Sequence, residues 1–270
     1  MTRSFGILIL AGLCFVPPAR AADCDAMLAI TGAPESLGEA PDHTRLCRLG
    51  YVLDYDNERK DPIWVIEWLK PERFKGSADR EKLGNPFAPD PDLQADKRAE
   101  LSDYRGSGYD RGHMAPAASM KFSTEAMKES FYLSNMAPQV GIGLNRGIWA
   151  GLEKLTRTWT CDRSELVVIT GPIFDEQPKS IGRDAVAVPS AFFKIVYEPG
   201  RKRAIAFILP NTKIDLGGHD AWEALKSYIV PIAQVEAETG LNFLSKLSAR
   251  DQKRLETRKS IMWPDRGECH

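Results

Sequence analysis

The sequence predicts an α+β fold with a mixed or antiparallel central sheet to which helices are added. Four runs of bulky and β-branched residues, bounded by turn residues, are typical of strands, whereas apolar residues beyond Asp220 recur at helical spacing. Hydrophobic residues make up 43% and charged residues 27% of the 270, which excludes a disordered or fibrous chain. No linker divides the chain, so we expect one domain over residues 23–270.

The expected elements follow in chain order. Residues 23–60 mix glycine, proline and charge, and an irregular arm is expected there. Residues 70–107 are polar and predict a long surface loop. The expected strands are Ile63–Leu69, Leu166–Thr170, Ala191–Tyr197 and Arg203–Leu209, the last two joined by a turn at Pro199-Gly200.

Helices are expected in three places. Ser123 is a suitable N-cap for a short helix that ends near Phe131. An apolar stripe that includes Ile148, Trp149 and Leu152 predicts a longer helix from Asn145 to about Trp159. The region from Asp220 through Leu244 has helical periodicity as well.

The first 22 residues are expected to be a signal peptide. Arg3 precedes an apolar run, Phe5–Val16, that is shorter than the roughly 20 residues needed to span a bilayer. The small-x-small pattern Ala19-Arg20-Ala21 follows and predicts cleavage after Ala21 or Ala22. We therefore expect a periplasmic or secreted protein with no membrane insertion after cleavage; an uncleaved anchor is the alternative.

Cleavage would remove Cys14 and leave four cysteines, Cys24, Cys47, Cys161 and Cys269. An even number in an exported chain predicts disulfides, and three pairings are open. Cys24–Cys47 with Cys161–Cys269 is favoured because each bond would fix one terminus. A structural zinc site is disfavoured because the sequence has no close CxxC pair.

The charge balance limits the ways in which this chain could bind nucleic acid. The formal net charge is −1, and about −3 once Arg3 and Arg20 leave with the signal peptide. This argues mildly against coating of nucleic acid through bulk charge and allows a local basic cleft. A basic C-terminal stretch is more simply explained as a solvated helix face than as a DNA-binding surface; it comprises Lys246, Arg250, Lys253, Arg254, Arg258 and Lys259.

The segment Tyr109–Pro116 carries the strongest chemical signal. It contains Asp110, Arg111, a glycine that permits close backbone approach, and His113, one of only four histidines. A neutral imidazole is the natural general base near pH 7. Taken alone, a histidine such as His113 is more often structural than catalytic, and its neighbours change that balance.

Two polar residues on the longer predicted helix complete the pattern. Asn145 lies at the edge of the apolar stripe, and Glu153 lies about 80° round the helix from it. Asn145 could supply an oxygen to a hard cation such as Mg²⁺, with Glu153 orienting water near it. The alternative is that Asn145 only caps the helix.

These motifs resemble the DNA/RNA non-specific endonuclease family, which shares the ββα-metal (His-Me finger) site and includes secreted bacterial nucleases and mitochondrial endonuclease G. The resemblance runs from about Trp64 to Pro210 in several separate matches in the right order. They are Asp103–Gly108, Asp110–His113, Phe131–Asn135, Thr170–Phe174, and Val188-Pro189 with Phe192–Lys194.

The resemblance implies a role for individual residues. His113 would be the general base, Asn145 the single direct protein ligand of Mg²⁺ (Mn²⁺ or another divalent cation being possible), and Glu153 the carboxylate that orients water around the ion. Arg111 and Arg80 would stabilise the transition state. Asn135, Gln139 and Asp110 would bind substrate or shape the site. The products would carry 5′-phosphate ends, and a homodimer would be possible.

Two departures from the family pattern bear on these assignments. The Asn135-to-Asn145 gap is one residue longer than expected, which keeps Asn135 as a reserve metal ligand. Arg73 is a rival to Arg80. The leading hypothesis is hydrolysis of DNA and RNA; a degenerate binding protein, a small-molecule phosphodiesterase and a zinc hydrolase are the alternatives.

Overall fold

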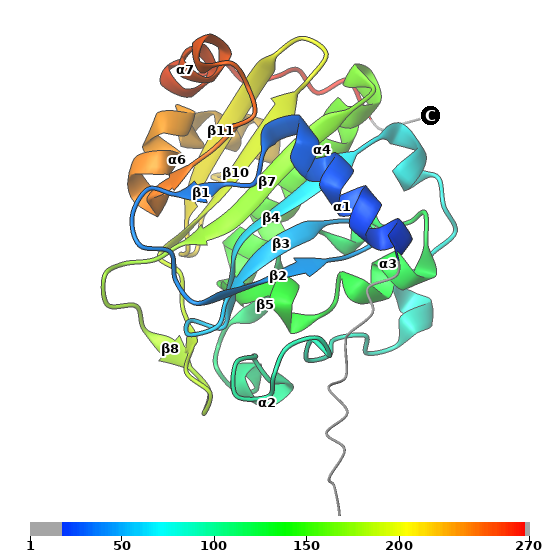
Figure 1. The fold of residues 1–270 in the computed structure, drawn as a ribbon, viewed down its shortest axis with the longest axis vertical. Coiled ribbons are helices and arrows are strands. Elements are labelled where there is room, and N and C mark those ends of the chain that lie inside the picture. Colours follow the sequence, from blue (N-terminus) through cyan, green and yellow to red (C-terminus); the bar gives the residue numbers. More distant parts are fainter. Residues whose placement is uncertain (1–17, 268–270) are drawn as a thin grey trace, which may run out of the picture.

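A seven-stranded antiparallel sheet forms the centre of the molecule in the computed structural model, which describes residues 18–267 (Figure 1). Its strand order is β12-β11-β10-β7-β4-β3-β2, and every pairing in it is antiparallel. The α+β class with an antiparallel sheet is therefore confirmed.

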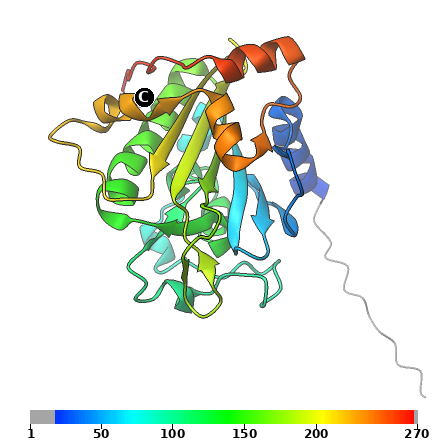
Figure 2. The same ribbon diagram turned by 90° about the vertical axis from the view of Figure 1, so that its left-hand side faces the viewer.

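Helices cover both faces of the sheet, which makes a three-layer arrangement (Figure 2). On one face α1, α6 and α7 contribute Met27, Val235 and Leu255 to an apolar cluster. On the other face α4 and the segment before it contribute Trp149, Leu152 and other residues to a larger cluster. A strand covered on both sides has no polar face, which explains why β4 and β7 are almost continuously apolar.

The strands have the following bounds: β1 Glu35–Ser36, β2 His43–Cys47, β3 Val52–Asp56, β4 Asp61–Leu69, β5 Asp110–His113, β6 Met136–Gln139, β7 Leu166–Ile173, β8 Ser180–Ile181, β9 Val186–Ala187, β10 Ala191–Glu198, β11 Arg203–Pro210, β12 Ile229–Val230 and β13 Leu241–Asn242. Besides the main sheet, the pairs β1-β13, β5-β6 and β8-β9 each form a two-stranded sheet.

The α-helices are α1 Pro18–Thr31, α2 Leu101–Tyr104, α3 Thr124–Glu129, α4 Ala150–Arg163, α5 Ala221–Leu225, α6 Ile232–Thr239 and α7 Ala249–Thr257. Shorter helical turns occur at η1 Pro71–Phe74, η2 Glu81–Leu83, η3 Ala117–Ser119, η4 Leu133–Asn135 and η6 Lys226–Tyr228. A kinked π-helical segment, η5 Gly141–Trp149, leads into α4.

Most predicted elements are confirmed, and the following expectations were wrong. The longer helix, α4, begins at Ala150 and not at Asn145, because Gly147 in η5 is non-helical. Ile229–Val230, expected to be helical, is the strand β12, which pairs with β11. Residues 23–60 are not an irregular arm, because they contain most of α1 and the strands β2 and β3. The segment Leu241–Leu244 is a short strand followed by a residue at φ 57°, not a helix. β7 continues through Gly171-Pro172 to Ile173, because it pairs with β10 along its length.

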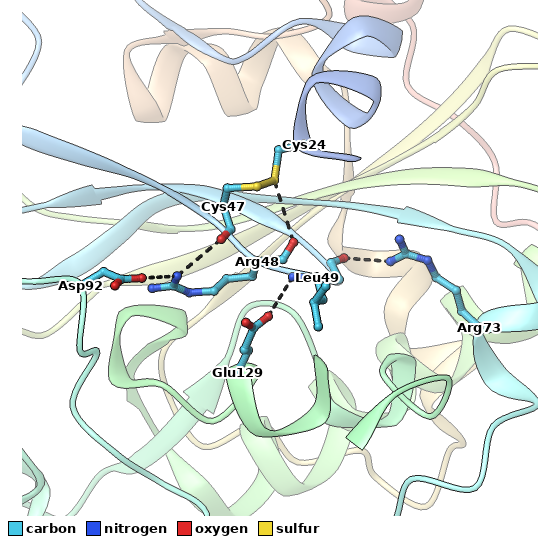
Figure 3. The surroundings of a disulfide bond; sticks show 8 residues. Cys24, Cys47, Arg48, Leu49, Arg73, Asp92 and Glu129 are labelled. Carbon is cyan, nitrogen blue, oxygen red and sulfur yellow. Dashed lines mark hydrogen bonds and ion pairs between the residues drawn. A yellow bond between two sulfur atoms is a disulfide. The ribbon is translucent and has the colours of Figure 1, made fainter. Parts of the chain in front are cut away.

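The predicted Cys24–Cys47 disulfide is confirmed and ties α1 to β2 (Figure 3). Next to it, Arg48 is buried and forms ion pairs with Asp90 and Asp92, each at 2.6 Å. The backbone N–H of Leu49 donates to Glu129 at 2.8 Å. The bond therefore fixes the N-terminal helix to the sheet edge on which the loops around the site are anchored.

Two predictions fall partly outside the described residues. The pair Cys161–Cys269 cannot be followed, since Cys269 lies outside them. The same holds for residues 1–17 of the expected signal peptide, and its cleavage point falls in the first turns of α1. Within residues 18–267, no helix is long and apolar enough to cross a membrane.

Candidate active site

The frame of the site is a two-stranded hairpin followed by a helix. β5 pairs with β6 so that His113 lies opposite Met136 and Asp110 opposite Gln139. The chain then passes through η5 into α4, which packs against the main sheet through Leu152, Leu155 and other apolar residues. This ββα frame brings the segment around His113 next to the polar face of α4.

Asn135 fastens the two strands together at the end next to His113. Its side chain is fully buried, accepts a hydrogen bond from the Ala115 N–H at 2.9 Å and donates to the carbonyls of Ala115 and Ser130. Its own carbonyl accepts from Met114. With both ends of its amide used in this way, Asn135 lies behind the site, not in the position of a metal ligand or substrate contact.

Gln139 is also buried beneath the hairpin. A Cβ atom on Gly112 would lie 2.2 Å from its Oε1, so the glycine permits this close approach. Asn211 holds the other end of β6, because its amide donates to the Pro138 carbonyl at 2.9 Å and accepts from the Val140 N–H at 2.8 Å. Gln139 therefore packs against the backbone of β5 and does not reach the cleft surface.

His113 lies against two aromatic rings. Its imidazole packs edge to face on Phe131 at 5.0 Å and lies 5.9 Å from Phe87. Burial, reinforced by the charges of Arg80 and Arg111, lowers the pKa of His113 to about 3. The ring is therefore neutral at pH 7, which is the form a general base requires.

The same rings hold two arginines. The Arg111 guanidinium lies 4.0 Å from the Phe87 centroid, and Arg80 lies 5.2 Å from that of Phe131. Neither forms an ion pair with a carboxylate in the described part of the chain, so both keep their donors for an anion. Arg73, the rival to Arg80, is turned away and donates to the Gly50 carbonyl at 2.8 Å.

Asn145 faces Asp110 across the site. Its Nδ2 donates to Asp110 Oδ2 at 2.9 Å, and Arg146 Nε donates to the same oxygen at 2.7 Å. Arg146 holds the pKa of Asp110 below its ordinary value, with Asn145 contributing. Asp110 is thus an anion that orients Asn145, rather than a free group that would bind phosphate. The alternative that Asn145 only caps the helix is excluded. Its side chain donates to Asp110, and the residue in the N-cap position of η5 is Val140.

The segment between Asn135 and Asn145 is kinked within η5. Gly143 has φ 88°, and a Cβ there would lie 2.5 Å from the Ile214 carbonyl oxygen. A Cβ on Gly141 would lie 2.8 Å from Asp110 Oδ2. Glycines at these two positions let the loop turn tightly enough to bring Asn145 to Asp110.

Glu153 is connected to charges beneath the site. Burial raises its pKa, while Lys194, Arg157 and a hydrogen bond from Trp149 act in the opposite direction. The Trp149 indole N–H also lies 3.4 Å from the His113 carbonyl oxygen, and Lys194 Nζ lies 4.8 Å from the Trp149 ring. Trp149 therefore links the segment of His113 to the helix that carries Glu153.

Two adjoining clefts share these residues. One has a volume of 700 Å³ and is lined by Asn145, Asp110 and Arg111 among others, and the second has 560 Å³. Arg80, His113 and Glu153 line both. The structure thus brings His113, Arg111, Arg80, Glu153, Asp110 and Asn145 together, whereas Asn135 and Gln139 lie behind them.

Sequence reasoning missed several residues that build this site. Phe87, Arg146, Lys194 and Asn211 each act through a partner more than 20 positions away in the chain. Arg157 was missed although it follows Glu153 by one helical turn, a spacing that places both on one side of α4. Lys194 lies in the Phe192–Lys194 match, but nothing local indicates its contact with Thr170, and no comparable signal marks the others.

The site combines a neutral imidazole, two arginines with free donors, and an amide beside two carboxylates. These are the groups that a phosphodiester hydrolase requires. Comparison with known proteins agrees. A family model described as DNA/RNA non-specific endonuclease matches residues 33–250. The chain belongs to this family, and it is a nuclease.

Individual relatives extend this result. The chain is 39% identical over 218 residues to the human protein named "Endonuclease G, mitochondrial", covering 75% of this chain and 70% of the relative. It is 39% identical over 212 residues to "Nuclease C1" of Cunninghamella echinulata var. echinulata, covering 74% and 82%. A chain in a crystal structure of an EndoG/EndoGI complex superposes with a TM-score of 0.73 at 31% identity, covering 88% of this chain and 96% of that one.

Proposed function

We propose that this protein is an exported, Mg²⁺-dependent endonuclease that hydrolyses both DNA and RNA to products with 5′-phosphate ends. The observation that carries the proposal is the position of His113. It is neutral and lines two clefts together with Arg80 and Glu153. Two joined clefts suit a length of polymer better than a small phosphate ester that one closed pocket would surround.

In the proposed reaction, His113 takes a proton from a water molecule as that water attacks phosphorus. The bond between phosphorus and the 3′-oxygen breaks. The 3′-oxygen leaves with a proton from water and becomes a hydroxyl, and the phosphate stays on the 5′-oxygen of the other fragment. Arg80 and Arg111, held on aromatic faces, stabilise the charge that gathers on the non-bridging oxygens. Glu153 orients water in the cleft, and Trp149 fixes its position relative to His113.

The residues present fit a divalent cation. Asn145 lines the cleft, and its Nδ2 is engaged by Asp110, which leaves its amide oxygen available to coordinate a cation. Mg²⁺ keeps several waters and needs few protein oxygens, and Mn²⁺ would accept the same donors. When bound, such an ion would neutralise phosphate charge and assist the leaving 3′-oxygen.

Export is supported by the expected signal peptide, residues 1–22, and by the Cys24–Cys47 disulfide, a bond typical of oxidising compartments. We propose residues 23–270 as the mature single-domain protein, in the periplasm or outside the cell. Several relatives carry "mitochondrial" in their names, so retention in an organelle is the competing location.

Replacing Asn145 by alanine should raise the Mg²⁺ concentration needed for half-maximal cleavage by about tenfold or more, since even residues that only support metal ligands contribute roughly 10–100-fold to affinity. Titration of Mn²⁺ into the intact protein, followed by electron paramagnetic resonance, measures the same loss without turnover. Asn85→Ala is the matched control, because Asn85 lines the same cleft and is exposed. An unchanged metal requirement in Asn145→Ala would place the ligand elsewhere.

A further inference from the structure

A second cationic cleft lies at the far end of α4 from the site. We call it the C-terminal basic groove. It has a volume of 430 Å³ and joins the β10–β11 hairpin to α7 and the segment that follows. Its lining includes six cations, Arg163, Arg201, Arg203, Arg254, Arg258 and Lys259, and no carboxylate. The sequence alone does not reveal this cluster of cations, because three of the six, Arg163, Arg201 and Arg203, lie outside the basic C-terminal stretch.

The wall of the groove is firmly built. The Trp159 indole N–H donates to the Pro264 carbonyl at 3.1 Å, and that of Trp222 donates to Trp263 at 2.8 Å. Trp263 is itself buried, and the Arg163 guanidinium lies 4.4 Å from its ring centroid. The segment after α7 is therefore fixed on the domain, and Arg163, with a side chain only 9% exposed, is fixed with it.

Neighbouring carboxylates balance only part of this charge. Glu198 lies 3.4 Å from Arg163 and 3.5 Å from Arg201, and Asp251 lies 3.3 Å from Arg254. Arg203, Arg258 and Lys259 are exposed and have no carboxylate partner anywhere in residues 18–267. A concentration of like charge is unfavourable unless an anion compensates it, and this protein has a net charge of only −1.

We infer that the C-terminal basic groove is a second, non-catalytic binding site for the phosphate backbone of nucleic acid, which anchors polymer substrate away from the cleavage site. The inference rests on the proposed function for its choice of polyanion. Glu153 and Arg163 are ten residues apart on α4, which separates the two sites by at least about 15 Å along the helix axis. At a rise of roughly 3.4 Å per base pair along the duplex axis, only duplexes of about five or more base pairs could reach both sites.

The test is binding of a 30-base-pair DNA duplex to the full mature protein in EDTA, measured by fluorescence anisotropy across a series of salt concentrations. The triple variant Arg203→Gln/Arg258→Gln/Lys259→Gln removes the unpaired cations of the groove. The control Lys246→Gln/Arg250→Gln/Lys253→Gln removes three cations that are also exposed but do not line the groove. Both lose the same charge, and urea denaturation verifies that both are folded.

We expect the slope of log affinity against log salt to fall in magnitude by about 2–3 in the groove variant, since each lost phosphate contact contributes about 0.9. The control should keep the wild-type slope. If the slope falls equally in both variants, the effect comes from general surface charge and the inference is overturned. A wild-type slope in the groove variant would overturn it as well. Loss of inorganic phosphate binding with unchanged duplex binding would also overturn it, in favour of a small-anion site.

Because this measurement needs no cleavage, it separates the inference from the proposed function. A protein that binds through the groove but cuts nothing would refute the nuclease mechanism and leave the anchor standing. With Mg²⁺ present, the groove variant should raise KM for plasmid DNA more than it lowers kcat, whereas damage at the cleavage site would lower kcat.

Discussion

Replacing His113 by alanine should lower the rate of nucleic-acid cleavage by about 10²–10⁴-fold, the usual contribution of a positioned general base. The methyl group cannot accept a proton from water, while Arg80, Arg111 and Asn145 remain to bind phosphate and metal. Because burial and the two arginines lower the pKa of His113 to about 3, the wild-type base stays unprotonated well below pH 6.5. We therefore expect the acid limb of the pH–rate profile to fall below the range of an ordinary histidine.

The control is His219→Ala. His219 lies in an exposed turn after two glycines and lines neither cleft of the site. Initial rates on plasmid DNA are measured for both variants between pH 4 and 8. They distinguish the loss of a general base at His113 from a nonspecific effect of removing any histidine. Equal rates in His113→Ala and wild type would refute the assignment, and equal losses in the two variants would point to folding.

Replacing Lys194 by methionine should destabilise the protein by about 3–5 kcal/mol, the range for leaving a buried carboxylate without the cation that compensates its charge. Lys194 is fully buried and donates to Thr170 Oγ1 at 2.6 Å. It is also the main positive charge facing Glu67, whose pKa burial raises to about 7. The other charges that act on Glu67 are Arg73 from η1 and Glu153 and Arg157 from α4.

The loss of unfolding free energy in Lys194→Met should increase as the pH rises. Burial raises the folded-state pKa of Glu67 above its unfolded value, so its contribution to stability is present below pH 4.5 and is lost as pH rises through 7. Without Lys194 that pKa rises further, and the variant's deficit should be larger at pH 8 than at pH 5. Urea denaturation at both pH values measures it, with exposed Lys202→Met as control. A deficit under about 1 kcal/mol at pH 8 would contradict the account.

The parts of the fold that sequence predicted are those with a strong local pattern. β4, β7, β10 and β11 are apolar runs bounded by turn residues, and Ser123 does cap α3 by accepting from the Ala126 N–H. α1 was missed because a leader and an arm were expected there, although Cys24 and Met27 are spaced to bury one helical face. β2 is short and polar, and only its pairing with β3 makes it a strand.

For the candidate site as well, the residues that could be predicted from sequence are those in local motifs. His113, Arg111, Asn145 and Glu153 lie in short motifs, and the structure brings them to one cleft. The roles of Asp110, Asn135 and Gln139 depend on partners far away in the chain. Arg146 occupies the Asp110 carboxylate, and burial removes Asn135 and Gln139 from the surface. Such pairings are set by tertiary packing, which no local spacing encodes.

Metal-dependent cleavage with His113 as the base is tested most directly by incubating the purified mature protein with supercoiled plasmid and with ribosomal RNA, each with Mg²⁺ or with EDTA, beside His113→Ala. We expect both polymers to be degraded only with the metal and only by the wild type, and the new ends to carry 5′-phosphate. If the folded, oxidised protein leaves both polymers intact in Mg²⁺, or if His113→Ala cuts them as fast as the wild type, the proposed mechanism is wrong.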